Sequence, residues 1–138
     1  MNTKPILIVS GEPYGVFNEI FFKVKKKNFF NKPIILIGSK KILLEQMIKF
    51  KYKFKFNLLD HKNIELTKLK RNNQVINLVN IDLVSFKDSN RKKRVIQTYI
   101  KNCFNIGLDI LSKYKCAGVI NGPINKKTFL NFRRRKLN

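Results

Sequence analysis

Short runs of apolar residues recur along the chain, separated by segments in which apolar residues follow a helical period. Uninterrupted apolar runs of about four to eight residues are typical of strands buried on both faces of a parallel sheet. Such runs predict buried strands over Lys4–Val9, Ile34–Ile37 and Ala117–Asn121. Aromatic and polar residues alternate in Phe54–Leu58, which predicts a half-buried strand, and Val75–Val84 is also strand-like.

Longer segments carry apolar residues at spacings of three and four, the period of an amphipathic helix. They predict helices over Asn18–Lys27, Lys40–Phe50 and Ser89–Lys115. The residues of the second helix expected to face inward are Leu43, Leu44, Met47 and Ile48. Those of the third are Val95, Ile96, Tyr99, Ile100, Cys103, Phe104, Leu108, Leu111 and Tyr114. Gly107 lies inside the third helix, where a glycine indicates close packing against a neighbour.

The alternation of strands and helices predicts a layered α/β/α fold with a mostly parallel sheet. A chain of 138 residues fits one domain. We assign residues 1–131 to an incomplete α/β domain, because a last helix begins near Lys126, directly after a strand and a loop. Residues 132–138 form a basic tail, and residues 60–73 are expected to be an irregular connection.

The charge of the chain raises the question of a polyanionic partner. Thirty Lys and Arg stand against 8 Asp and Glu, which gives a formal net charge of +22. Basic residues are spread along the whole chain, so a solvated basic surface explains them better than one nucleic-acid footprint. A small nucleic-acid or polyanion-binding module stays open as an alternative, and non-specific binding to polyanions is expected in either case.

Few residues suit redox or metal chemistry. Cys103 and Cys116 are too few for a disulfide framework and are interpreted as packing residues of a cytosolic protein. His61 is the single histidine and is expected to be a plain surface residue. No His, Cys or carboxylate cluster has metal-ligand spacing. No apolar run approaches the roughly 18 residues of a membrane span.

Two loops follow predicted strands, the place where open α/β sheets bind ligands. The first reads Gly11-Glu12-Pro13-Tyr14-Gly15 and precedes a helix N-terminus, which favours anions. The second reads Gly122-Pro123-Ile124-Asn125-Lys126, in which Asn125 can donate and accept and Lys126 can hold an anion. Ordinary strand-to-helix turns are the alternative for both loops.

Taken together, the two loops resemble the 4-hydroxythreonine-4-phosphate dehydrogenase family. That family has a strand followed by Gly-Glu-Pro-Ala-Gly-Ile-Gly-Pro-Glu, and here Gly11, Glu12, Pro13, Gly15 and Glu19 match. Phe17 and Asn18 replace its Gly-Pro pair. The second loop resembles the family's strand followed by Gly-Pro-(Ile/Val)-(Asn/His)-Lys, and the two motifs occur in the family's order and spacing.

The resemblance implies part of an isocitrate/isopropylmalate dehydrogenase-like fold. It also implies a cytoplasmic homodimer of pyridoxal phosphate (vitamin B6) biosynthesis, which oxidises 4-phosphooxy-L-threonine with NAD or NADP and a divalent metal. The family's substrate motif Gly-His-Thr-Glu and its metal-binding histidines are absent from this sequence. We therefore carry over no catalytic or metal residue. A chain with only this part of the family's sequence is expected to be inactive alone, with a separately encoded C-terminal part as its partner.

The residues that the resemblance does carry over are candidates for lining the cleft of such an enzyme. They are Gly11, Glu12, Pro13, Gly15, Asn125 and Lys126.

Overall fold

The computed structural model describes residues 4–27, 31–84 and 89–124. The strands are β1 (Ile6–Val9), β2 (Ile34–Gly38), β3 (Lys55–Leu58), β4 (Val75–Asn80) and β5 (Gly118–Asn121). The helices are α1 (Phe17–Lys27), α2 (Lys40–Phe50) and α3 (Ser89–Lys113), with one 3-10 turn, η1 (Leu66–Lys68). Every predicted strand and helix within these residues is confirmed, most of them somewhat shorter than expected. The helix predicted near Lys126 lies outside the described residues.

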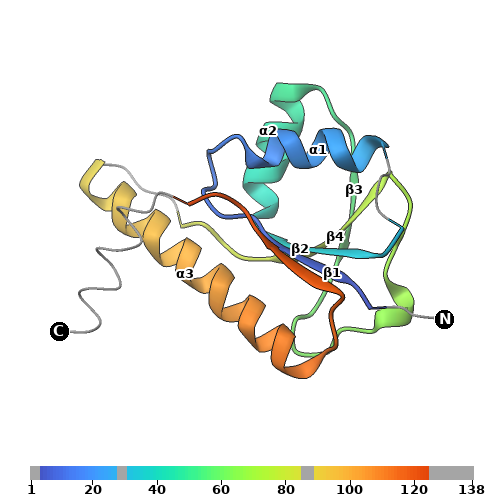
Figure 1. Cartoon of the computed structure of the whole chain (residues 1–138). Helices are drawn as coiled ribbons and strands as arrows, with labels where there is room; N and C mark the ends of the chain where they lie inside the picture. The colour runs from blue at the N-terminus through green and yellow to red at the C-terminus, as the bar shows by residue number, and fades with distance from the viewer. Residues whose placement is uncertain (1–3, 28–30, 85–88, 125–138) are drawn as a thin grey trace.

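The five strands form one sheet in the order β3-β4-β2-β1-β5. Each pairing between neighbouring strands is parallel. Helices α1 and α2 lie on one face of the sheet and α3 crosses the other (Figure 1). The expected α/β/α layering with a mostly parallel sheet is therefore correct.

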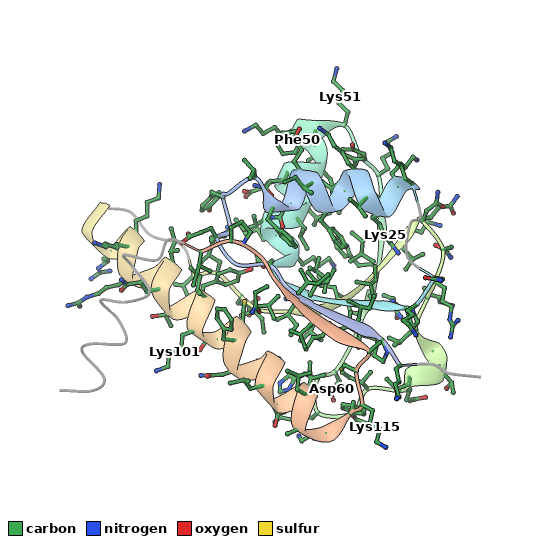
Figure 2. The ribbon with its side chains drawn as sticks, in the orientation of Figure 1. Lys25, Phe50, Lys51, Asp60, Lys101 and Lys115 are labelled. Atoms are coloured by element: carbon green, nitrogen blue, oxygen red, sulfur yellow. The ribbon has the colours of Figure 1, made fainter. Side chains whose placement is uncertain are left out.

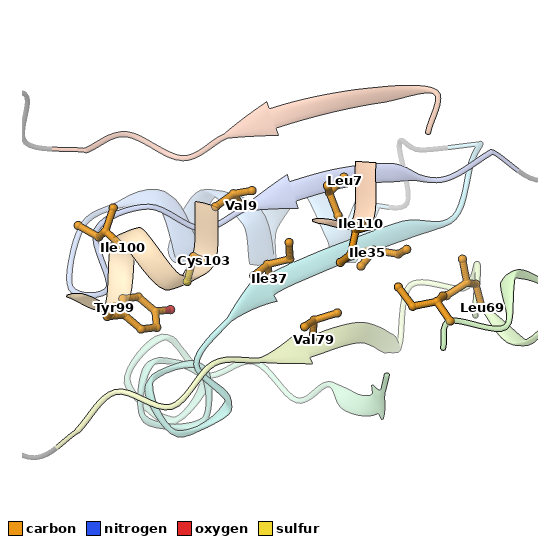
Figure 3. Close-up of a cluster of buried hydrophobic side chains, with 11 residues drawn as sticks. Leu7, Val9, Ile35, Ile37, Leu69, Val79, Tyr99, Ile100, Cys103 and Ile110 are labelled. Carbon is orange, nitrogen blue, oxygen red and sulfur yellow. The ribbon is translucent and has the colours of Figure 1, made fainter. Parts of the chain in front are cut away.

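The apolar runs of the central strands are explained by burial on both faces. On β1, Leu7 and Val9 face α3, whereas Ile8 packs against the layer of α1 and α2. On β2, Ile35 and Ile37 face α3 in the same way, and Leu36 faces the opposite layer. Figure 3 shows the α3 side of this core, with Tyr99 and Cys103 of α3 among the strand residues. Both faces thus exclude water from the middle of the sheet.

One polar residue is accommodated in the middle of β4. Asn77 is only 1% exposed, and its side chain donates to the carbonyl oxygens of Ile34 at 2.9 Å and Lys70 at 2.8 Å. Its Oδ1 accepts from Asn57 Nδ2 and from the Lys70 amide, both at 2.9 Å. A buried amide is tolerated when its donors and acceptors are satisfied, as they are here.

The expectation of a buried fifth strand is wrong. All four residues of β5 are exposed, including Val119 and Ile120 at 43% each. The strand lies at the edge of the sheet next to β1, and α3 packs over β1 and β2 instead. An apolar run does not show whether helices cover the strand that it forms. The burial predicted for this strand was therefore wrong, although the strand itself was predicted correctly.

Several predicted inward residues of the helices are exposed instead. Leu44 and Ile48 of α2 are 43% and 82% exposed, and Leu108 of α3 is 64% exposed. The buried stripe of α3 continues from Tyr99, Ile100 and Cys103 to Ile110, which is fully buried. Close packing at Gly107 is confirmed, because an added Cβ would lie 3.3 Å from Val9 Cγ2.

Within the described part of the chain, no helix is long and apolar enough to cross a membrane. The assignment of residues 1–131 and 132–138 to separate regions stays a prediction, and the basic tail lies outside the described residues.

The α3 stripe can be tested with a matched pair of substitutions. Ile110→Ala should lower the free energy of unfolding by about 2–5 kcal/mol, because it leaves a cavity in a filled core. Leu108→Ala should change it by less than about 0.5 kcal/mol, because that side chain is mostly exposed. Urea denaturation of both variants measures the difference, and equal losses would contradict this orientation of α3.

The buried Lys25 predicts a pH dependence of stability. Its side chain is 5% exposed, its Nζ donates to the Asn72 carbonyl oxygen at 2.7 Å, and burial lowers its pKa from 10.5. Between that lowered pKa and 10.5 the unfolded chain binds more protons at this site, so stability rises with pH. Lys25→Met should lose this contribution, whereas Lys26→Met, at an exposed neighbour, should keep it. The free energy of unfolding, measured in urea from about pH 8 upward, should therefore rise less steeply in Lys25→Met.

Candidate functional site

The strand order places the two loop motifs side by side. The chain runs from β1 to β2, continues to the edge strand β3 and comes back to β4 between them. Helix α3 then returns the chain to the other side of β1, where β5 lies. In Figure 1 the red end of β5 runs beside the blue loop that follows β1. A reversal of strand order at the carboxyl ends of parallel strands is the usual ligand position in open α/β sheets. The candidate site is therefore the junction of residues 10–16 with residues 121–124.

Backbone contacts join the two loops directly. The Glu12 amide donates to the Pro123 carbonyl oxygen at 3.1 Å, and the Gly122 amide donates to the Val9 carbonyl oxygen at 2.6 Å. The sequence linked these loops only through their resemblance to one family. The structure shows that they are in direct contact.

Glycine is required at the contact because the two backbones touch. Gly11 has φ +73°, and an added Cβ would lie 2.6 Å from the Pro123 carbonyl oxygen. A Cβ on Gly122 would collide with the carbonyl oxygen of Ser10. The space beside both glycines is therefore filled by the opposite loop. These glycines serve the junction between the loops and do not open a cradle for a ligand.

Asn18, one of the departures from the resembled motif, anchors the first loop. Its Nδ2 donates to Gln46 Oε1 of α2 at 2.6 Å and to the Pro13 carbonyl oxygen at 3.5 Å. Gln46 Nε2 also donates to that carbonyl oxygen, at 3.4 Å. Pro13 is thereby tied to both helices of one layer. Sequence reasoning treated Asn18 only as a mismatch, because Gln46 lies in a separate element with no motif to mark it.

A buried polar pair lies beneath the first loop. Ser10 Oγ and Tyr99 OH are 3.3 Å apart, and the two residues are only 2% exposed. Burial raises the pKa of the Tyr99 hydroxyl, with Cys103 as the second cause. Burial also raises the pKa of the Cys103 thiol to about 12. Both groups therefore stay protonated at neutral pH, which agrees with a packing role for Cys103.

The outer side of the first loop meets the basic first turns of α3. Tyr14 is 51% exposed, and Lys92 Nζ lies 5.9 Å from the centroid of its ring. Partial burial and the nearby Glu45 carboxylate raise the pKa of the Tyr14 hydroxyl. The sequence gave no sign of this contact, since 78 positions of chain separate the two residues and the Tyr14 ring is exposed.

The structure positions four of the six residues that we expected to line a cleft. Gly11, Glu12, Pro13 and Gly15 lie in the loop after β1, with Gly11 and Pro13 buried, Glu12 half-buried and Gly15 exposed. Asn125 and Lys126 lie outside the described residues, and the lining role of all six residues stays a prediction. His61 is partly buried, with its Nδ1 3.8 Å from Asp109 Oδ2, and lies far along the chain from both loops.

The described residues do not fit the divalent metal that the resemblance implies. Within residues 4–27, 31–84 and 89–124, no group of three or more His, Cys, Asp or Glu side chains could hold a metal ion. Glu12 is the sole carboxylate within the described parts of the two loops. Any metal ligands of such an enzyme would have to come from other residues.

Comparisons with solved structures find the same fold in one named group of enzymes. A putative 4-hydroxythreonine-4-phosphate dehydrogenase from Salmonella typhimurium matches 96% of this chain with a TM-score of 0.75 and 15% identity. The Klebsiella pneumoniae enzyme matches 93% with a TM-score of 0.71 and 17% identity. The Burkholderia phymatum enzyme matches 94% with a TM-score of 0.65 and 18% identity. No family model and no curated protein matches the chain.

The chain thus has the fold of one part of these dehydrogenases. It spans about two fifths of their length, since the matches cover 39–41% of the solved chains. The resemblance inferred from the two loop motifs and this fold comparison agree on the same group of proteins.

The contact between the loops predicts different costs for two glycine substitutions in one loop. Gly11→Ala should lower the free energy of unfolding by at least about 1–3 kcal/mol, because alanine is strained at positive φ and its Cβ would press on the Pro123 carbonyl oxygen. Gly15→Ala should cost less than about 1 kcal/mol, because its Cβ would only approach Glu12 Cβ at 3.4 Å. Urea unfolding of both variants checks this, and similar values for the two would contradict the described junction.

Proposed function

We propose that this chain forms one part of an NAD- or NADP-dependent dehydrogenase that acts on 4-phosphooxy-L-threonine in pyridoxal phosphate biosynthesis. In this proposal the loop 10–16 and the loop that begins at Gly122 form a wall of the substrate cleft. A cytoplasmic location and a homodimeric parent enzyme belong to the same proposal.

The observation that carries the proposal is the junction of the two loops. Glu12 and Pro123 belong to the two motifs that resemble the dehydrogenase family and are 111 positions apart in the sequence. The Glu12 amide nevertheless donates directly to the Pro123 carbonyl oxygen. Their meeting place is the carboxyl end of β1, where the strand order reverses. The fold shared with the three dehydrogenases supports the same assignment.

The wall offers groups suited to a phosphorylated, zwitterionic substrate. The first loop leads into the N-terminus of α1, whose dipole favours negative charge such as a phosphate. Glu12 lies half-buried in the same loop, and its carboxylate is negatively charged. A carboxylate can bind the ammonium group of the substrate or accept a hydrogen bond from its hydroxyl. In the proposed role the chain binds and orients substrate. The sequence contains neither the resembled family's Gly-His-Thr-Glu motif nor its metal-binding histidines, so we propose that the chain alone is inactive.

A titration with substrate tests the proposal on the chain itself. Adding 4-phosphooxy-L-threonine should shift the amide NMR signals of the non-proline residues in 11–16 and 122–124 more than those of the lysine-rich surface. Glu12→Gln should weaken binding about tenfold, equivalent to about 1.4 kcal/mol. Glu65→Gln is the matched control, because Glu65 pairs with Lys68 at 3.0 Å on η1, away from both loops, and should bind as wild type does.

Inorganic phosphate at equal ionic strength serves as the second control. A chain with a net charge of +22 attracts any anion, so equal shifts with phosphate, spread over exposed lysines, would contradict a substrate site.

That last result would favour the second candidate function, a polyanion-binding surface. The observation behind it is the connection from α2 to β3, where Lys49, Lys51, Lys53 and Lys55 are all exposed. Lys49 Nζ lies 5.3 Å from the Phe50 ring centroid, and Lys51 projects from the end of α2 into solvent (Figure 2). The neighbouring rings Tyr52 and Phe54 stack on each other in the core instead of facing outward, with centroids 5.9 Å apart. The aromatic residues interleaved with these lysines therefore serve mainly the fold, which is why we rank this function second.

A further inference from the structure

The first loop is held from two sides at one dipeptide, Glu12-Pro13. On one side, the Glu12 amide donates to the Pro123 carbonyl oxygen at 3.1 Å. On the other side, Asn18 Nδ2 and Gln46 Nε2 both donate to the Pro13 carbonyl oxygen, at 3.5 Å and 3.4 Å. The dipeptide is therefore fixed between the second loop and the layer of α1 and α2.

Every polar backbone group of this dipeptide has a partner. The Glu12 carbonyl oxygen accepts from the Gly15 amide at 3.3 Å, and Pro13 has no amide hydrogen to donate. The proline ring also restricts φ, so the dipeptide has little freedom to rotate. The direction in which the Glu12 side chain leaves the loop is thus fixed by these backbone contacts.

Gln46 contributes to this arrangement from a separate helix. Its Oε1 accepts from Asn18 Nδ2 at 2.6 Å, while its Nε2 donates to the Pro13 carbonyl oxygen. Because the two side chains also bond to each other, α2 and the first turn of α1 act on the loop together. Turning either amide over would place its oxygen against the Pro13 carbonyl oxygen, so the loop sets the orientation of both amides.

This orientation leaves the oxygen of the Asn18 amide without a partner. Asn18 is 3% exposed, and its Oδ1 is buried with no hydrogen-bond partner among the described residues. A buried acceptor without a donor destabilises a fold, whereas an apolar side chain of similar shape would avoid this cost. Departures of this kind are expected at functional sites. The contact with the loop therefore explains the amide better than packing does.

We propose that Asn18 and Gln46 are positioning residues, which hold Glu12 in the orientation in which its carboxylate meets the substrate. The role in substrate binding rests on the proposed function, whereas the restraint on the loop rests on the hydrogen bonds alone. Gln46 acts through Glu12 and does not contact the substrate itself. The resembled family has Gly-Pro at the positions of Phe17 and Asn18, so this restraint belongs to the present sequence.

Amide hydrogen exchange tests the restraint without any ligand. Gln46→Met keeps the length of the side chain but removes its donor and its acceptor. The Glu12 amide should exchange at least tenfold faster, because the loop opens more often once the Pro13 carbonyl oxygen loses this donor. The Leu36 amide, in the central strand β2, should keep its rate. Gln74→Met makes the same change at an exposed side chain before β4, at the opposite end of the strands, and should leave both rates within about twofold of wild type.

A second variant separates the two functions of the Gln46 amide. Gln46→Glu keeps an acceptor for Asn18 Nδ2 but replaces the donor that faces the Pro13 carbonyl oxygen with an oxygen. It should accelerate exchange of the Glu12 amide as Gln46→Met does. Urea unfolding of each variant verifies that it is folded.

A double-mutant cycle tests whether Gln46 acts through Glu12. The probe is 4-phosphooxy-L-threonine, and the NMR titration gives its Kd. Gln46→Met should weaken binding about fivefold when Glu12 is present. In the Glu12→Gln background the same change should weaken binding less than about twofold, because the side chain that Gln46 positions has already lost its charge. A residue that only stabilised the fold would weaken binding by the same factor in both backgrounds.

Three results would overturn the inference: an unchanged exchange rate of Glu12 in both Gln46 variants, equal acceleration at Leu36, or equal losses of binding in the two backgrounds. Failure of the proposed function is recognised separately. Faster exchange at Glu12 in the Gln46 variants, combined with no substrate-specific shift in the wild-type chain, would reject the substrate and the role in binding but retain the restraint on the loop.

Discussion

The whole structure depends on covering a parallel sheet on both faces. Strands β1 and β2 alternate their side chains between two apolar layers, and neither layer alone could remove these strands from water. Helices α1 and α2 provide one cover and α3 the other (Figure 1). Where this cover ends, at β5, apolar side chains stay exposed on both faces. The exposure of β5 thus follows from the same constraint that organises the core.

The same connectivity creates the candidate site. Helix α3 must cross the sheet to cover the face opposite α1, and this crossing delivers β5 to the free side of β1. The loops after these two strands then meet so closely that Gly11 and Gly122 have no room for a Cβ. The candidate site and the exposed edge of the sheet therefore share strand β5.

The large positive charge influences the surface far more than the fold. Most lysines are exposed, and Lys25 is accommodated below the surface by its bond to the Asn72 carbonyl oxygen, at the expense of a lowered pKa. A net charge of +22 favours association with acidic molecules over self-association.

The sequence by itself determined the element types, their order and the parallel α/β class, because apolar period and turn residues are local properties. It also marked Gly11 and Pro123 as members of one resemblance. Only the tertiary structure decided that Ala117–Asn121 is an exposed edge, that Ile110 is buried while Leu108 is exposed, and that Asn18 anchors the loop. The burial of a side chain and its hydrogen-bond partners depend on which helix packs over which strand. Those contacts join residues that are distant in the sequence, so no local pattern predicts them.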